Sequence, residues 1–200
     1  MKSLPALLAA LAAALFLSSC TSPATNEPAG HDQGAGTPSS ATQPAAFNDA
    51  DVAFATNMIP HHQQAVEMSA MVPDRSTNPA VVKLAADISA AQGPEIETMK
   101  AFLVQWNAGG SDHQGHGDMA GGMHMDGMVD QAAMTKLESL KGPEFDTLWL
   151  QSMIGHHEGA IKMAQAELAG GANADAKTLA GQIVTGQQAE IVTMKQMLGG

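Results

Sequence analysis

The sequence predicts an all-α protein, specifically an antiparallel four-helix bundle built from two repeated helical hairpins. One observation is an internal repeat with a constant offset of 95 residues and no gap, since the segment 58–62, MIPHH, returns at 153–157 as MIGHH. The match continues to residue 103 in the first copy and residue 198 in the second. The other observation is that apolar residues recur in steps of three and four along four long segments, whereas no segment shows the alternation of a strand.

The first hairpin is predicted from two of these segments. Its first helix runs from about residue 48 to 72, with an inward seam of Phe54, Met58, His61, Ala65, Met68 and Val72. The second helix begins at Asn78-Pro79, because Asn caps helices well and proline fits the first helical position, and it ends before Gly109-Gly110. Its seam consists of Ala85, Ile88, Gln92, Glu95, Met99, Phe102 and Trp106.

The second hairpin follows a short helix that we expect at about residues 129–140. Its first helix starts near Pro143 and ends at Gly170-Gly171, with the seam Trp149, Met153, His156, Ala160 and Met163. Its second helix spans about 174–198, with the seam Ala180, Ile183, Gln187, Glu190, Met194 and Met197. Pro60, Gly155 and Gly93-Pro94 interrupt these helices beside the polar seam residues, and we expect them to bend the backbone so that it aims side chains.

The amino terminus has the plan of a secretion signal over residues 1–19. A positive Lys2 precedes an apolar run over 4–17, and small residues then precede Cys20, as in a bacterial lipoprotein cleavage site. Cys20 would then carry the lipid that anchors the chain to a membrane; the alternative is an ordinary signal with an incidental cysteine. Because Cys20 is the only cysteine, an intramolecular disulfide and a thiolate metal site are excluded.

Composition separates a tether from the folded part. Residues 20–46 are rich in Pro, Ser, Thr, Ala and Gly, so they are predicted to be a disordered tether. The bundle domain is expected over 47–200, with one repeat at 48–106, a Met/His-rich loop at 107–128 and the second repeat at 143–198. The formal net charge of −11 disfavours nucleic acid as a partner and attracts cations.

Polar residues interrupt the apolar seam at matching places in both repeats. Leaving such groups buried without partners would cost roughly 1–3 kcal/mol each, so they must bond one another or hold an ion. One reading is a His–Glu–Gln hydrogen-bond network that fixes helix register. The other is a metal site in each repeat, in which Gln92 and Gln187 contact the ligands and not the ion. The candidate ligands are Met58, His61, His62, Met68, Glu95 and Met99 in the first copy, and Met153, His156, His157, Met163, Glu190 and Met194 in the second.

The loop between the repeats offers a second set of donors: His113, His116, Met119, Met123, His124, Met125 and Met128. No helical or alternating pattern would bury these residues, and chance low-complexity sequence is the alternative explanation. Thioethers are soft ligands that prefer Cu(I) or Ag(I) to Mg, Ca or Mn, and imidazole also binds Cu(II). The donors therefore favour copper, as Cu(I) first, with Cu(II) or Ag(I) possible.

The chain resembles the domain-of-unknown-function family numbered 305. The resemblance rests on the paired-histidine motifs with Ala65 and Met68, on Trp149-Leu150, and on Gln187 through Met194. It implies a ferritin-like four-helix bundle, an extracytoplasmic location and, in some members, copper binding or copper tolerance.

Three functions remain open. The leading one is an extracytoplasmic, lipid-anchored protein, not an enzyme, that buffers copper or passes it to a copper-transport partner. The second is a non-metal interaction module whose paired histidines act as a register lock or pH sensor. The third is a di-metal bundle oxidoreductase, which would need more inward carboxylates and a Glu-x-x-His step that is missing here. Divergence at 60/155 and at 63–64/158–159 leaves open whether both repeats bind metal.

Overall fold

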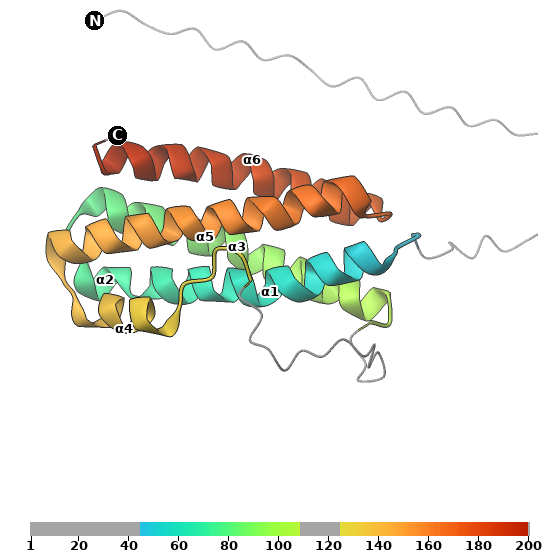
Figure 1. The fold of residues 1–200 in the computed structure, drawn as a ribbon, viewed down its shortest axis with the longest axis horizontal. Coiled ribbons are helices and arrows are strands. Elements are labelled where there is room, and N and C mark those ends of the chain that lie inside the picture. Colours follow the sequence, from blue (N-terminus) through green and yellow to red (C-terminus); the bar gives the residue numbers. More distant parts are fainter. Residues whose placement is uncertain (1–44, 109–124, 200) are drawn as a thin grey trace, which may run out of the picture. The chain divides into compact units, whose positions relative to one another are not determined.

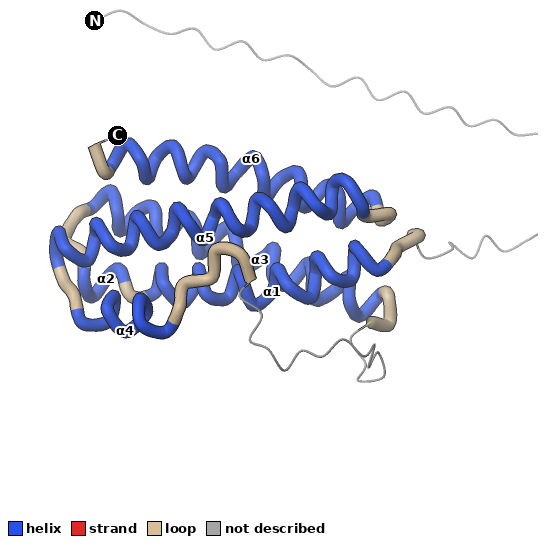
Figure 2. Tube along the Cα trace, in the orientation of Figure 1, coloured by secondary structure: helices blue, strands red, loops and turns tan. Residues whose placement is uncertain are grey.

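The structure, a computed structural model, describes residues 45–108 and 125–199 and contains only helices and loops within these ranges (Figures 1 and 2). The prediction of an all-α fold is confirmed. Within the described residues, six helices follow one another: α1 Asp49–Ala70, α2 Val72–Arg75, α3 Pro79–Gln105, α4 Gln131–Ser139, α5 Gly142–Gly170 and α6 Ala174–Met197.

Short polar residues fix where three of the four long helices, α1, α3 and α6, begin. The Asn48 side chain accepts hydrogen bonds from the first turn of α1, and the Asp51 carboxylate accepts one from the Asn48 N–H, which completes a capping box. Asn78 and Asn173 cap α3 and α6 in the same way, and Asp130 caps α4. These caps explain why the helix starts could be read from the sequence.

The four long helices form two hairpins, α1 with α3 and α5 with α6 (Figure 1). Within each hairpin the two helices pack against each other along their length. The hairpins join mainly through α1 and α5, whereas α3 and α6 touch at few points. The antiparallel four-helix bundle is therefore confirmed, with α1 and α5 as its central pair.

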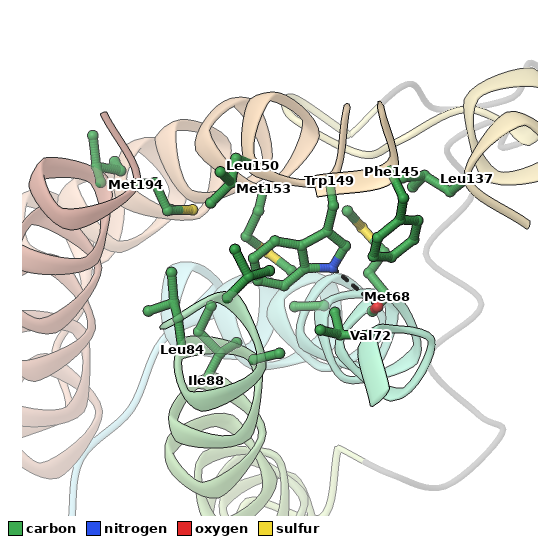
Figure 3. Close-up of a cluster of buried hydrophobic side chains, with 14 of the residues drawn as sticks. Met68, Val72, Leu84, Ile88, Leu137, Phe145, Trp149, Leu150, Met153 and Met194 are labelled. Atoms are coloured by element: carbon green, nitrogen blue, oxygen red, sulfur yellow. Dashed lines mark hydrogen bonds between the residues drawn. The ribbon is translucent and has the colours of Figure 1, made fainter. Parts of the chain in front are cut away.

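Buried apolar side chains form two clusters, one toward each end of the bundle. Trp149 and Phe145 belong to the larger cluster, where the Trp149 indole N–H donates to the Met68 carbonyl at 3.0 Å (Figure 3). Phe54, Met58 and Met99 belong to the smaller one. The two clusters meet at a polar layer in the middle of the bundle.

Several predicted boundaries and burials differ from the structure. The first helix ends at Ala70 rather than residue 72, because a turn at Met71 leads into α2 with Pro73 in its first turn. Phe102, Met163 and Met197 were expected to face inward but are only half-buried.

The described residues, 45–108 and 125–199, belong to one compact unit. Among the described helices, none combines the length and the apolar character that crossing a bilayer would require. The predicted signal at 1–19 and nearly all of the tether lie outside the described residues.

Candidate metal centre

Four histidines lie in one layer at the middle of the bundle, and each is fully buried. Successive residues of a helix point about 100° apart, so adjacent histidines on α1 and α5 face different neighbours. The rings of His61 and His156 meet across the α1–α5 interface, with centroids 3.8 Å apart and planes tilted by 38°. We call these two rings the central imidazole pair.

The other two histidines each turn toward the second helix of their own hairpin. His62 Nε2 lies 2.8 Å from a carboxylate oxygen of Glu95, and His157 Nε2 lies 2.7 Å from one of Glu190. Because a carboxylate only accepts, Nε2 carries the proton in the neutral ring and Nδ1 keeps its lone pair. A carboxylate that bonds a ring in this way commonly orients a metal-bound imidazole, so Glu95 and Glu190 orient the rings of His62 and His157.

Many polar atoms of this layer have no hydrogen-bond partner among the described residues. Unpaired buried groups of this kind cost roughly 1–3 kcal/mol each, so ordered water or a bound ion would have to satisfy them. They are both ring nitrogens of His61 and of His156, Nδ1 of His62 and of His157, and the side-chain amide atoms of Gln92 and Gln187. A hydrogen-bond network limited to these residues therefore accounts for only two of the four rings.

The environment keeps the central imidazole pair neutral. Burial lowers the pKa of His61 to about 4, helped by the neighbouring His62 and His157 and opposed by the backbone of Asp126. Burial likewise lowers the pKa of His156 to about 2, and the three other histidines add to the effect. Near neutral pH both rings thus present free lone pairs, which is the form that binds metal ions.

Thioethers flank the histidine layer on both sides, in two groups that combine the hairpins. In the first hairpin, Met58, four residues before His62, faces Met99, four residues after Glu95. Met153 and Met194 are the equivalent pair in the second hairpin. The smaller apolar cluster holds Met58 and Met99 together with Met163 of the other hairpin. The larger cluster holds Met153 and Met194 together with Met68 (Figure 3). Met68 and Met163 thus lie with the opposite repeat from the one in which sequence placed them.

The donor set decides which ion would fit. Among residues 45–108 and 125–199, no three His, Asp or Glu side chains converge in a way that could hold an ion. A site built in this layer would therefore have to add methionine sulfur to imidazole nitrogen, which suits Cu(I) or Ag(I) and not Zn or a di-iron centre. The residues present fit a soft monovalent ion.

The remaining predicted ligands fall into two groups. His113, His116, Met119, Met123 and His124, with the predicted lipidation residue Cys20, lie outside the described residues. Met125 and Met128 are described, and both are half-buried in the turn before α4. The structure thus brings the carboxyl end of the Met/His-rich loop to the surface of the bundle.

Sequence reasoning missed the residues that hold this turn. Gln64 bonds the backbone of Val129 with both ends of its amide, while Gly127 and Gly159 let two backbones touch. The available signal was the divergence of the repeats, because Gln64 and Gly159 occupy equivalent positions. It also missed a buried carboxyl pair, Asp51 and Glu167, at the far end of α1 and α5.

Fold and site together define an all-α bundle with paired, buried histidines at its middle. The chain belongs to the family named Domain of unknown function (DUF305), whose model matches residues 51–198.

Solved structures of similar proteins share this fold. A DUF305 protein from Streptomyces coelicolor, described as secreted, has a TM-score of 0.67 and 37% identity, covering 75% of this chain and 92% of its own. A DUF305 fragment from Deinococcus radiodurans has a TM-score of 0.66 and 32% identity, covering 76% and 97%. CopM in its Cu(I)-bound form has a TM-score of 0.60 and 28% identity, covering 74% and 94%. CopM has also been solved bound to Cu(II), bound to silver and in the apo form.

Among curated proteins, the uncharacterized protein L153 of Acanthamoeba polyphaga mimivirus is 40% identical over 58 residues. The match spans 29% of this chain and 38% of that relative.

Proposed function

We propose that this protein binds copper, as Cu(I) in preference to Cu(II), and buffers it or passes it to a partner outside the cytoplasm. The observation that carries the proposal is the histidine layer, in which the neutral rings of the central imidazole pair lie between two groups of methionine sulfurs. Such donors prefer soft monovalent ions and need no carboxylate ligand. Binding rather than catalysis is proposed, because Glu95 and Glu190 are each engaged by a histidine.

The relatives support the same chemistry. CopM shares the fold and has been solved with Cu(I), Cu(II) and silver, ions that the donors of this chain also suit. The acidic composition would raise the local concentration of cations around the bundle.

The location follows from the amino terminus. The proposed signal over 1–19 would direct the chain out of the cytoplasm, and a lipid on Cys20 would hold it at the membrane through the tether. Mass spectrometry of the protein from its own cell envelope would test this: a diacylated Cys20 as the first residue supports it, and an unmodified mature chain contradicts the anchor.

Isosteric substitutions test the copper site. In anaerobic titrations against a chromogenic Cu(I) chelator, we expect the Met58→Leu/Met99→Leu double variant to bind Cu(I) about tenfold more weakly than the unchanged protein, or worse. Leucine preserves the packing and removes only the sulfur. The matched control is Met134→Leu, another buried methionine, which should bind Cu(I) normally. Absence of Cu(I) binding by the unchanged protein would refute the proposal.

A second variant separates the bundle from the loop. Changing Met119, Met123, Met125 and Met128 to Ala should lower the number of Cu(I) ions bound while the bundle stays folded, because the loop contributes capture sites of its own. An unchanged stoichiometry would confine binding to the helices.

A non-metal role also has one observation in its favour, namely the His62–Glu95 and His157–Glu190 bonds. These bonds join the two helices of each hairpin and would fix their register without any ion.

A further inference from the structure

A tight turn at residues 125–128 precedes α4. The Met128 N–H donates to the Met125 carbonyl at 3.0 Å, and Gly127 has φ of +86°. A positive φ at the third position of such a turn favours glycine, so the residue type fits the turn. We call this segment the docked turn.

The docked turn lies directly on the backbone of α5. A Cβ on Gly127 would lie 2.7 Å from the Gly155 carbonyl oxygen and 3.0 Å from that of His156. A Cβ on Gly159 would overlap the Asp126 carbonyl. The two backbones can touch only because Gly127 and Gly159 both lack side chains.

A side chain of α1 holds the other side of the turn. The Gln64 amide donates to the Val129 carbonyl and accepts from the Val129 N–H, each at 2.8 Å. The segment that precedes α4 consequently bridges α1 and α5 (Figure 1).

The turn crosses the bundle where the two central rings meet. Gln64 and Gly159 are equivalent residues of the two repeats, 95 positions apart, and they contact the turn from opposite helices. His61 and His156 are equivalent in the same way, and their rings meet across the same interface. A feature shared by two equivalent residues lies near the axis that relates the repeats. The docked turn and the central imidazole pair therefore both lie near this axis.

Only one thickness of chain separates the His61 ring from solvent at this place. The Asp126 backbone lies close enough to the ring to oppose the lowering of its pKa by burial, whereas the Asp126 side chain is exposed. The His61 ring is fully buried, and its nitrogens make no hydrogen bond of good geometry with a described residue. The turn thus covers the ring without pairing it.

The docked turn is held less firmly than the helices beneath it. Its ion pair, Asp126 with Lys162, is exposed and therefore contributes little. Met125 and Met128 are only half-buried. Segments with few buried apolar contacts open at a lower free energy than core helices do. Lifting the turn from α1 and α5 should therefore leave the four long helices packed.

We propose that the docked turn is a lid over the central imidazole pair, which excludes water from both rings when closed and lifts to let a small solute reach them. This inference rests on the proposed copper-binding function and adds a control on how fast an ion enters and leaves, for which no side chain of the turn needs to touch the ion. It also accounts for the divergence of the repeats at 64 and 159. A single lid across two equivalent helices needs an anchor on one helix and clearance on the other.

Two pairs of variants test the lid, and each contains its own control. Gly159→Ala should displace the turn, whereas a Cβ on Gly155 meets nothing within 4 Å, so Gly155→Ala should leave it in place. Both changes should favour the helix to a similar degree. Gln64→Ala removes the anchor, and Gln63→Ala changes the exposed neighbour. Because the two pairs act on different helices, either pair tests the lid if a variant of the other fails to fold.

Diethyl pyrocarbonate is the probe for access, because it acylates neutral imidazoles that it can reach, and peptide mass spectrometry identifies the modified histidine. Without any metal, we expect His61 and His156 to react about tenfold faster in Gly159→Ala and in Gln64→Ala than in the unchanged protein. The two control variants should match the unchanged protein.

The other two histidines distinguish a lid from a general loosening. His62 and His157 turn toward α3 and α6, so their reactivity should stay low in every variant. Equal reactivity of His61 in all five proteins would overturn the lid. A rise at all four histidines together would also overturn it, because the turn would then brace the whole bundle.

Release of Cu(I) separates the lid from the proposed function. In stopped-flow transfer from the loaded protein to a chromogenic chelator, Gly159→Ala should release Cu(I) about tenfold faster than Gly155→Ala. Equal release rates would overturn the lid as a control on the ion. If the unchanged protein binds no Cu(I) while His61 still becomes reactive in Gly159→Ala, the proposed function fails and the lid stands.

Discussion

Asp51 and Glu167 are single residues that tie one end of the bundle together. The Asp51 carboxylate accepts the backbone N–H groups of Asn48 at 2.6 Å and of Asn173 at 2.9 Å, which joins the start of α1 to the α5–α6 connection. Glu167 is 1% exposed and lies beside Asp51, and neither of its carboxyl oxygens accepts a hydrogen bond from a described residue.

The pKa values of the two carboxyls are shifted in opposite directions. Although burial opposes the change, backbone hydrogen bonds from Asn173, Asn48 and Ala172 lower the pKa of Asp51. Burial and the adjacent Asp51 raise the pKa of Glu167 to about 7, with Lys177 opposing. Near neutral pH the pair therefore changes between sharing one proton and carrying two negative charges.

The first prediction concerns the dependence of stability on pH. A raised acid pKa stabilises the folded state below the unfolded value, 4.5, and that contribution is lost as the pH rises through about 7. Relative to Glu167→Gln, which mimics the protonated acid, the unchanged protein should lose roughly 1–3 kcal/mol of unfolding free energy between pH 5 and pH 8.

Urea denaturation of both proteins at the two pH values measures this difference. Glu144→Gln, at an exposed position on the same helix, is the control and should keep the pH dependence of the unchanged protein. Equal pH dependence in the Glu167→Gln variant and the unchanged protein would contradict the shared proton. Comparing variants is necessary because His61 and His156, whose pKa values are lowered, reduce stability as pH falls below 6.5.

At the scale of whole helices, the two hairpins show that the His–Glu bond does not need a proline before the glutamate. α3 contains Pro94 immediately before Glu95, whereas α6 has Ala189 before Glu190. The His–Glu distances are nevertheless 2.8 Å and 2.7 Å. Because the alanine-bearing helix makes the same bond, the expectation that Pro94 aims its neighbour is unnecessary.

The second prediction is that Pro94→Ala stabilises the protein without changing metal binding. Alanine restores a backbone N–H inside α3 and removes the clash of the proline ring, which should raise the unfolding free energy by about 1–3 kcal/mol. The reverse change, Ala189→Pro in α6, should lower it by a similar amount. Thermal denaturation and Cu(I) titration measure the two effects, and weaker Cu(I) binding by Pro94→Ala would show that the proline does position Glu95.

Across the whole molecule, the candidate ligands come from both hairpins. The central imidazole pair spans α1 and α5, and each methionine group takes one residue from the opposite hairpin. An ion bound in this layer would connect the hairpins, so folding and binding should be strongly linked.

The third prediction follows from this linkage. A ligand at 100 times its dissociation constant stabilises the folded state by about 2.7 kcal/mol, which corresponds to a Tm increase of roughly 5–10 °C for a domain of this size. Scanning calorimetry with Cu(I) under reducing, anaerobic conditions, and with Ag(I), should show the increase. Zn(II) should give a much smaller one. An unchanged Tm with both soft ions would favour the structural role of the His–Glu pairs.

The sequence by itself determined the helices, their caps and the positions of the donors along the chain. Helix caps and apolar periodicity act over a few residues, so the cap at Asn78 was recognised without knowledge of the fold, and Asn48 and Asn173 act through the same local chemistry. The 95-residue offset likewise paired His61 with His156 and Glu95 with Glu190 as equivalents.

Only the tertiary structure decided which donors meet. Packing α1 against α5 in antiparallel fashion puts Met68 with the second repeat and Met163 with the first, because residues before one histidine pair lie beside residues after the other. The same packing brings Gln64 and Gly159 together around one turn. Spacing along a chain fixes the face of a helix on which a residue lies, but contacts between helices depend on how their surfaces fit.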